Sequence, residues 1–285
     1  MMAPLAAHPT LEDCDFRVIR DLAYRRAGLY FTDAKRRIVA ARLQKRLRAL
    51  GLPDFAPYVR RLREDELEVQ KMVEALCILQ TRFFREPRQF ELIEQVLCPA
   101  WVQSAAQGWR KRRVRALSAA CSTGEEAFSI AMTLSHCLGK DRPWEIEVVA
   151  GDVSSCALAK AERAEWPIVR ARHVPEAYMR EFMVQGAGPM AGVVRAVPSL
   201  RRLVHFLPLN LNDPAHLVSG RFDIVFCRNV LVYFDAGSRE RAVQGLMPHL
   251  APEGLLFVGR TESVVGYQDR LTPVIPSVYR HTAAA

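Results

Sequence analysis

Hydrophobic positions in the first quarter of the chain recur at helical spacing. Residues 16–79 carry few strand signals, and Gly28 and Gly51 mark turns between the apolar runs. Between residues 33 and 50, four apolar side chains fall on one stripe when the chain turns by roughly 100° per residue, namely Val39, Leu43, Leu47 and Leu50. The pattern predicts an all-helical domain over residues 10–79.

From about residue 112 the pattern changes to short apolar runs that alternate with helical stretches. This alternation is typical of an α/β fold with a mostly parallel sheet. The predicted strands are 112–118, 145–151, 203–207, 222–227 and 254–259. The predicted helices are 125–138, 155–165 and 237–250. We therefore expect a second domain, over residues 80–285, built on one sheet.

Residues 174–202 interrupt this rhythm. A glycine-rich stretch, Gly186–Gly192, is flanked there by short apolar and basic runs, which predicts a small β-subdomain inserted in the main sheet. Such an insertion can be a purely structural excursion or a surface that docks a partner, and the sequence leaves both open.

The net charge of +9 is concentrated in the helical domain. Residues 17–63 hold 14 Lys and Arg against three acidic residues. A solubilising face normally mixes both signs, so the scarcity of acids favours a surface that recruits an acidic partner. Its expected members are Lys35, Arg36, Arg42, Lys45, Arg46 and Arg48, and the last four should lie opposite the apolar stripe, free to meet that partner.

Other broad features narrow the class of protein. No apolar run reaches membrane-spanning length, and the N-terminus lacks a basic cluster followed by a long apolar run. The seven cysteines form no Cys-x-x-Cys pair and no zinc-type spacing with histidine. We therefore expect a cytoplasmic protein without membrane insertion, structural metal or disulfide bonds.

The segment Ser118–Glu126 reads Ser-Ala-Ala-Cys-Ser-Thr-Gly-Glu-Glu and joins the first predicted strand to a helix. In an open parallel sheet the ligand lies beside such a turn, at the carboxyl ends of the strands. With the single glycine Gly124 and no Gly-Lys-Ser/Thr, the loop does not match a triphosphate site. Its acidic end suits a cation such as S-adenosylmethionine, whose α-ammonium group a glutamate can bind. An ordinary turn with solvated glutamates is the alternative.

Polar residues also follow the second and fourth predicted strands. Asp152 can accept hydrogen bonds from ribose hydroxyls, or it can cap the helix that begins near Ser154. Arg228 and Asn229 follow a buried apolar run, so we expect them at the mouth of the pocket. The Asn/Asp-Pro-Pro-Tyr segment with which adenine methyltransferases hold a flipped base does not occur there. A nucleic-acid substrate is therefore disfavoured.

Thr81-Arg-Phe-Phe-Arg-Glu86 lies at the junction of the two predicted domains. Phe83 and Phe84 are most simply core anchors that join the domains. The guanidinium of Arg85 can hold a carboxylate bidentately, which is one way to orient an acidic substrate.

Together these motifs resemble those of the chemotaxis receptor glutamate methyltransferases, the CheR family. The resemblance covers the chain from about Phe16 to Tyr279, in order and at the expected spacings. It rests on Thr81-x-Phe-Phe-Arg-Glu86, Cys121-Ser-Thr-Gly-Glu-Glu126, Phe226-Cys-Arg-Asn-Val230, Tyr233-Phe-Asp235, and Gly254-Leu-Leu-Phe-Val-Gly259 with Glu262. Two departures from the family pattern occur, Leu79 in place of Asn and Arg260-Thr261 in place of His-Ser. We expect them to alter cofactor affinity at most.

The resemblance implies a class I, Rossmann-like methyltransferase sheet with an N-terminal all-α domain and an inserted β-subdomain. It implies transfer of a methyl group from S-adenosylmethionine to glutamate carboxylates of chemoreceptors, with S-adenosylhomocysteine as the product. The helical domain would face the receptor's cytoplasmic helical domain, and the β-subdomain can bind a receptor's C-terminal peptide. The family's cofactor contacts fall on Thr81, Arg85, Ala120, Glu126, Asp152, Asn210, Leu211, Arg228 and Asn229.

Such a reaction needs little acid–base machinery, because a glutamate side chain is already ionised at neutral pH. Positioning and partial desolvation of the carboxylate suffice. Arg85 and Tyr233, which matches a tyrosine near the transferred methyl, are the candidate catalytic residues. Two alternatives remain: a nucleic-acid methyltransferase whose basic helix binds phosphates with steep salt dependence, and a non-catalytic module, which the nearly intact motifs disfavour.

Overall fold

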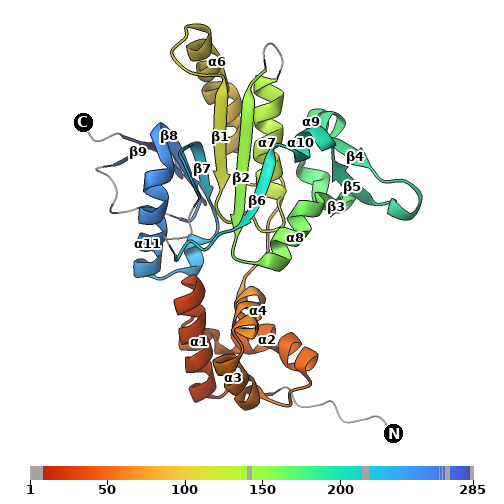
Figure 1. Cartoon of the computed structure of the whole chain (residues 1–285), viewed down its shortest axis with the longest axis vertical. Helices are drawn as coiled ribbons and strands as arrows, with labels where there is room; N and C mark the ends of the chain where they lie inside the picture. The colour runs from red at the N-terminus through yellow and green to blue at the C-terminus, as the bar shows by residue number, and fades with distance from the viewer. Residues whose placement is uncertain are drawn as a thin grey trace. The chain divides into compact units, whose positions relative to one another are not determined.

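The computed structural model describes residues 9–139, 143–213, 218–262, 264, 266 and 270–282. The chain divides into two compact units. One comprises Met1–Ile78 together with Tyr233–Arg239, and the other comprises Leu79–Val232 together with Glu240–Ala285. Each unit is described separately below (Figure 1).

The first unit is helical, as the periodicity predicts. Its main helices are α1 (Asp13–Ala27), α2 (Arg36–Leu50), α3 (Phe55–Glu64) and α4 (Glu66–Leu76). Gly28 and Gly51 end α1 and α2 in left-handed conformations, with φ of 69° and 65°, which side chains other than glycine rarely adopt. Three of the four residues in the predicted stripe are buried, namely Val39, Leu43 and Leu47.

The helical unit also contains a segment from much later in the chain. Leu29 forms an isolated antiparallel bridge with Phe234, and the Tyr30 N–H donates to the Tyr233 carbonyl at 2.8 Å. The Tyr24 hydroxyl donates to Asp235 Oδ2 at 3.1 Å. The unit is therefore discontinuous in sequence.

The second unit is built on a seven-stranded sheet in the order β6-β2-β1-β7-β8-β10-β9. The first five of these strands are parallel to one another. Strand β10 pairs antiparallel with both of its neighbours, β8 and β9. All five predicted strands are confirmed, as β1 (Arg113–Ser118), β2 (Glu145–Asp152), β6 (Val204–Pro208), β7 (Phe222–Cys227) and β8 (Leu250–Val258). The sequence did not predict β9 (Leu271–Ile275) or β10 (Val278–His281).

Helices pack against this sheet and complete the α/β class. They are α5 (Pro87–Leu92), α6 (Cys98–Ala106), α7 (Glu125–Leu138), α8 (Ser155–Arg163) and α11 (Ala236–Leu246), with a π-helical turn, Ile93–Leu97, between α5 and α6. The predicted helix 125–138 is confirmed by α7. The predicted helix 237–250 ends earlier, at Leu246, and continues as a 3-10 turn (Met247–His249) that contains Pro248.

A second, three-stranded antiparallel sheet is inserted between α8 and β6, in the order β3-β5-β4. Its elements are β3 (Glu165–Pro167), the 3-10 helix η3 (Ile168–His173), α9 (Glu176–Phe182), β4 (Met183–Gln185), β5 (Val193–Ala196) and α10 (Pro198–Arg201). The range 174–202 holds two of the three strands, and β3 precedes it. The sheet projects beside α8 in Figure 1.

Within the described part of the chain, no helix is both long and apolar enough to cross a bilayer. Residues 1–8, on which the expectation about a leader segment depends, lie outside the described residues.

Candidate functional site

The parallel register brings four strand ends to one edge of the sheet. Ser118 of β1 lies beside Ala150 of β2 and Phe226 of β7, and Asp152 at the end of β2 lies beside Pro208 of β6. The chain segments that follow these strands therefore leave the sheet side by side. They carry seven of the predicted cofactor residues: Ala120, Glu126, Asp152, Asn210, Leu211, Arg228 and Asn229.

The loop between β1 and α7 is held tightly. Gly124 has φ of 92°, and a Cβ there would lie 2.9 Å from the Cβ of Ala161, so only glycine fits this turn. Ser122 also has a positive φ, of 50°, and its N–H donates to Asp152 Oδ2 at 2.8 Å. A left-handed conformation at a residue other than glycine stores strain, which is common at functional sites.

Asp152 binds main-chain groups on two sides. Its Oδ1 accepts from the Ser154 N–H at 2.9 Å, and its Oδ2 accepts from Ser122. The N-cap of α8 is Ser154, whose side chain accepts from the Ala157 N–H, so Asp152 is not the cap that one interpretation of the sequence suggested. Asp152 instead positions the loop, and a carboxylate oxygen can accept more than one hydrogen bond.

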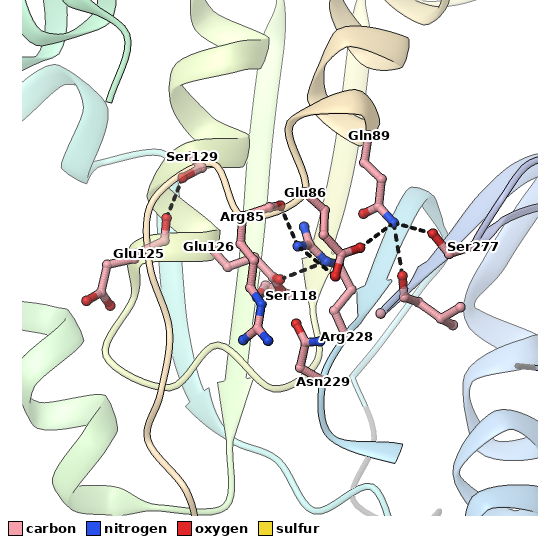
Figure 2. Close-up of polar contacts among 12 residues, drawn as sticks. Arg85, Glu86, Gln89, Ser118, Glu125, Glu126, Ser129, Arg228, Asn229 and Ser277 are labelled. Carbon is pink, nitrogen blue, oxygen red and sulfur yellow. Dashed lines mark hydrogen bonds and ion pairs between the residues drawn. The ribbon is translucent and has the colours of Figure 1, made fainter. Parts of the chain in front are cut away.

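Glu126 and Arg228 form a buried pair at the centre of this edge (Figure 2). The Arg228 side chain is fully buried, and its Nε lies 3.6 Å from Glu126 Oε2. Glu126 Oε1 accepts from the Ser118 hydroxyl at 2.8 Å. Burial raises the pKa of Glu126, and the neighbouring Arg228 charge and the Ser118 hydrogen bond oppose that shift.

Several buried polar atoms at this edge have no hydrogen-bond partner among the described residues. They include Nε and Nη1 of Arg228 and the hydroxyl oxygen of Ser122. Buried polar groups are almost always bonded in folded proteins, so these atoms fit a site that a polar ligand completes. A buried glutamate beside unsatisfied donors suits a ligand that carries both charges, as the amino-acid end of S-adenosylmethionine does.

The segment 81–86 reaches the same centre from outside the sheet. The Arg85 carbonyl accepts from Arg228 Nη2, and Arg85 Nη1 donates to the Gln80 carbonyl at 3.2 Å. Phe84 and Glu86 have positive φ values, of 49° and 60°. The segment is thus fixed by the buried arginine and by a strained backbone.

Phe83 and Phe84 are core residues of the methyltransferase unit. Phe83 meets Trp166 edge-on, with ring centroids 5.0 Å apart, and Phe84 stacks on Tyr178 at 5.3 Å. The Phe84 N–H also donates to the Ser129 hydroxyl at 3.0 Å. They therefore anchor segment 81–86 within this unit.

A buried carboxylate to which we assigned no role from the sequence, Glu262, holds the turn after β7. Glu262 Oε2 accepts from the N–H groups of Asn229 and Gly259, each at 2.7 Å, and its Oε1 accepts from the Val232 N–H at 3.2 Å. Asn229 has φ of 58°. The departures at Arg260 and Thr261 lie between Gly259 and Glu262 and leave these bonds in place. The only advance signal for this role was the position of Glu262 in the motif.

The other predicted cofactor residues lie around this centre. Asn210 Oδ1 accepts from the Asn212 N–H at 3.0 Å, and Leu211 is buried beside it. The Thr81 carbonyl accepts from Arg170 Nη1 at 3.3 Å. Within the described residues, no group of three or more His, Cys, Asp or Glu could hold a metal ion.

The remaining predicted site residues belong to the helical unit. Tyr233 lies there, as do all six residues of the basic surface. Arg46 is not free to meet a partner, because it binds the buried Glu68 through two hydrogen bonds of 2.9 and 2.6 Å. Arg42 donates to the Leu76 carbonyl. The idea that both face away from the apolar stripe was wrong, since Arg46 follows Val39 by seven residues and so returns to within about 20° of it.

Other members of that surface differ in exposure. Lys45 and Arg48 are exposed, and Lys35 and Arg36 are half-buried. Arg36 pairs with Asp13. Fewer residues of the predicted basic surface are therefore exposed than the sequence suggested. Of its six predicted residues, Lys45 and Arg48 are the exposed ones.

Replacing Asp152 with alanine is expected to weaken S-adenosylhomocysteine binding by about tenfold or more. The variant loses the bond that holds Ser122 and the oxygens that we expect to accept from ribose hydroxyls, together worth roughly 1.5–3 kcal/mol. Calorimetric titration measures the affinity, and thermal unfolding checks the fold. Wild-type affinity in this variant would mean that Asp152 does not bind the ligand and only positions the main chain at Ser122 and Ser154.

Comparison with known proteins shows the family of the chain. The model of the CheR methyltransferase SAM binding domain matches residues 79–279, and that of the CheR all-alpha domain matches residues 15–77. The chain is 37% identical to chemotaxis protein methyltransferase 2 of Pseudomonas aeruginosa over 272 residues, which cover 95% of this chain and 94% of that protein. It is also 37% identical to the chemotaxis protein methyltransferase of Escherichia coli, over 94% of this chain and 91% of that one. The chain thus belongs to the CheR methyltransferase family and is an S-adenosylmethionine-dependent methyltransferase.

Proposed function

We propose that the protein transfers a methyl group from S-adenosylmethionine to glutamate side chains of chemoreceptors, giving glutamyl methyl esters in chemotaxis-type adaptation. The observation that carries the proposal is the buried Glu126–Arg228 pair with its unsatisfied donors, at the strand edge where this fold binds its ligand. The relatives named above, which are chemotaxis protein methyltransferases, support the choice of pathway.

The residues at the sheet edge suit the parts of the cofactor. Glu126 would bind the α-ammonium group, and Asp152 would accept from the ribose. The loop around Ala120, the Asn210–Leu211 segment, Thr81 and the Arg228–Asn229 turn would line the remaining surface. S-adenosylmethionine supplies a methyl group bonded to a positively charged sulfur, which makes the group electrophilic.

The protein's own part in the reaction is to orient and desolvate the attacking carboxylate. Because that carboxylate is ionised at neutral pH, with a reference pKa of about 4.3, no base has to remove a proton. Arg85 has a half-exposed side chain, and its bond to the Gln80 carbonyl uses Nη1, so other donors of its guanidinium can hold a carboxylate. We assign the orienting role to Arg85 and Tyr233.

The decisive experiment incubates the protein with tritiated S-adenosylmethionine and membranes that hold candidate chemoreceptors. Base-labile label on the receptor band is expected, because a methyl ester hydrolyses in alkali. Label on nucleic acid instead of protein would favour the nucleic-acid methyltransferase. The Arg85→Ala variant should lose turnover at an unchanged melting temperature; full turnover would remove Arg85 from the reaction.

The exposed part of α2 is the proposed docking surface for the receptor's cytoplasmic helical domain. The glutamates that await methylation make that partner acidic, and opposite charges on the two partners speed their encounter. Lys45 and Arg48 lie on one side of the helix, three residues apart, and both are exposed. Arg42 and Arg46 contribute less directly, because they hold the helical unit together.

Reversing both charges, Lys45→Glu with Arg48→Glu, is expected to slow receptor methylation by roughly tenfold at low salt and much less at high salt. The affinity for S-adenosylhomocysteine should not change. Lys111→Glu is a control, since this exposed residue lies just before β1 in the methyltransferase unit, outside both proposed receptor contacts. Unchanged methylation in the double variant would show that this surface does not dock the receptor. Salt-sensitive binding of the protein to RNA would support a nucleic-acid methyltransferase instead.

The inserted sheet is a second proposed receptor contact. Strand β4 lies at its edge and exposes Val184, and an extended peptide can add a strand to such an edge. The C-terminal peptide of a receptor is the proposed occupant. Methylation of a receptor that lacks this tail should be slower; an equal rate would leave the insertion a structural element.

A further inference from the structure

The inserted subdomain touches the cofactor loop through two side chains that the reaction itself does not use. Trp166 of β3 donates its Nε1–H to the Thr123 carbonyl at 3.1 Å. Arg170 of η3 places Nη2 3.4 Å from Glu125 Oε1 and donates through Nη1 to the Thr81 carbonyl at 3.3 Å. Thr81 and the loop containing Thr123 both belong to the cofactor site.

Glu125 is as unusual as its neighbour Glu126. Glu125 is fully buried, and its Oε2 accepts from the Thr123 hydroxyl at 2.6 Å. Its Oε1 has no hydrogen-bond partner among the described residues. Figure 2 shows the two glutamates pointing in opposite directions from the start of α7. Glu126 faces Arg228 of the main sheet, whereas Glu125 meets Arg170 of the insertion. Each buried carboxylate therefore has an arginine from a different element.

Trp166 adds an aromatic contact to the same loop. Its ring meets Phe83 and Phe128 edge-on, with centroids 5.0 and 5.1 Å away. Phe83 belongs to segment 81–86, and Phe128 belongs to the first turn of α7. One tryptophan thus packs against both chain segments that flank the cofactor, while its N–H fixes the carbonyl between Ser122 and Gly124.

We propose that Arg170 and Trp166 are positioning residues for S-adenosylmethionine, through which the inserted subdomain holds the cofactor loop in its binding conformation. The strained backbone at Ser122 needs such support, because a positive φ at a residue other than glycine persists only where surrounding contacts enforce it. By thermodynamic reciprocity, cofactor binding must then also stabilise the inserted sheet. The inference requires only the cofactor-binding activity and not the proposed receptor substrate.

The affinity for S-adenosylhomocysteine tests the positioning role. We expect Arg170→Gln to weaken binding by about tenfold, because it leaves Glu125 buried without its counter-charge. Trp166→Phe, which keeps the ring and removes the N–H, should weaken it by about threefold. Arg170→Lys should give an intermediate affinity. Arg172→Gln is the matched control, since this exposed residue of η3 bonds only to His173 among the described residues; it should bind like the wild type.

Two further readouts separate positioning from general stability. The KM for S-adenosylmethionine should rise in Arg170→Gln while kcat at saturation stays within about twofold. In a double-mutant cycle, Glu125→Gln should add little to Arg170→Gln, because the two residues act as a pair. Strict additivity, or wild-type affinity in Arg170→Gln, would overturn the proposal.

Hydrogen exchange tests the reciprocal effect. In the wild-type protein, S-adenosylhomocysteine should slow exchange of the β3, β5 and β4 amides, and in Arg170→Gln at saturating ligand this protection should largely disappear. Equal protection in the two proteins would show that the subdomain does not sense the cofactor through Arg170. Failure of receptor methylation would leave the calorimetric affinities and the exchange rates unaffected, since these two measurements contain no receptor; only KM and kcat need a methyl acceptor.

Discussion

Replacing Glu68 with alanine is expected to lower the free energy of unfolding of the helical unit by about 3–5 kcal/mol. The carboxylate is buried, binds Arg46 through both oxygens, and accepts from the Tyr58 hydroxyl at 3.0 Å. Burial, and then the Glu68 charge, raise the pKa of Tyr58 well above its ordinary value, so the phenol stays a neutral donor. The variant leaves the Arg46 charge and the Tyr58 hydroxyl without their acceptor.

Urea unfolding followed by circular dichroism measures this loss. Glu66→Ala is the matched control, because Glu66 lies two residues earlier on α4 and pairs with Arg26 while both side chains are exposed. Exposed pairs contribute about 0–1 kcal/mol. A Glu68→Ala variant as stable as Glu66→Ala would mean that the buried network adds nothing. A loss of the expected size is a large part of the total stability of a typical domain, about 5–15 kcal/mol.

Replacing Arg228 with methionine is expected to weaken S-adenosylhomocysteine binding by about a hundredfold, which corresponds to about 2.7 kcal/mol. Methionine fills similar space but removes the counter-charge of Glu126 and the donor to the Arg85 carbonyl. One buried partner without the other is costly. Calorimetric titration gives the affinity, and Arg201→Met, at an exposed arginine of the same unit, serves as the control.

The same variant has a pH signature. Burial already raises the pKa of Glu126, and Arg228 acts to lower it. Removing Arg228 must therefore raise that pKa further, so that Glu126 becomes protonated at a higher pH. Because the ionised form is the one that binds an ammonium group, the affinity of the variant should fall at a higher pH than that of the wild type when the solution is acidified. Parallel pH profiles would mean that Glu126 does not contact the charged end of the ligand.

The sequence predicted the five parallel strands well, because buried parallel strands are continuous apolar runs between polar turns. It missed β9 and β10, where this signal fails. Pro273 lies inside β9, and proline normally argues against a strand because it cannot donate to a neighbour. Here β9 lies at the edge of the sheet, where that missing donor is tolerated.

The end of α8 was also beyond the local pattern. The predicted helix continued to residue 165, but α8 ends at Arg163, where Ala164 adopts φ of 52°. Alanine carries no stop signal, unlike the glycines that end α1 and α2. Long-range contacts decide this boundary, because Trp166 must enter the inserted sheet and pack beside the cofactor loop.

The site residues also fall into those that the local sequence predicts and those that it does not. Residues directly after strand ends, such as Asp152 and Arg228, could be predicted because parallel strands deliver their carboxyl ends to one edge. The role of Arg170, which acts on the site from elsewhere in the chain, could not be predicted, since no spacing rule connects it to the site. Glu262 belonged to a recognised motif, but nothing in the sequence indicated which groups it binds. The role of Arg46 was missed for the same reason, because its partner Glu68 lies on another helix.

The discontinuity of the helical unit has a consequence during protein synthesis. Its first four helices leave the ribosome early, but the segment Tyr233–Arg239, which bridges to Leu29 and binds Tyr24, is made only after β1, β2, β6 and β7. Domains usually fold in order from the N-terminus as they emerge. Here the N-terminal unit waits, incomplete, until most of the methyltransferase sheet has been translated, so a nascent chain that stalls before residue 239 exposes unfinished surfaces in both units at once.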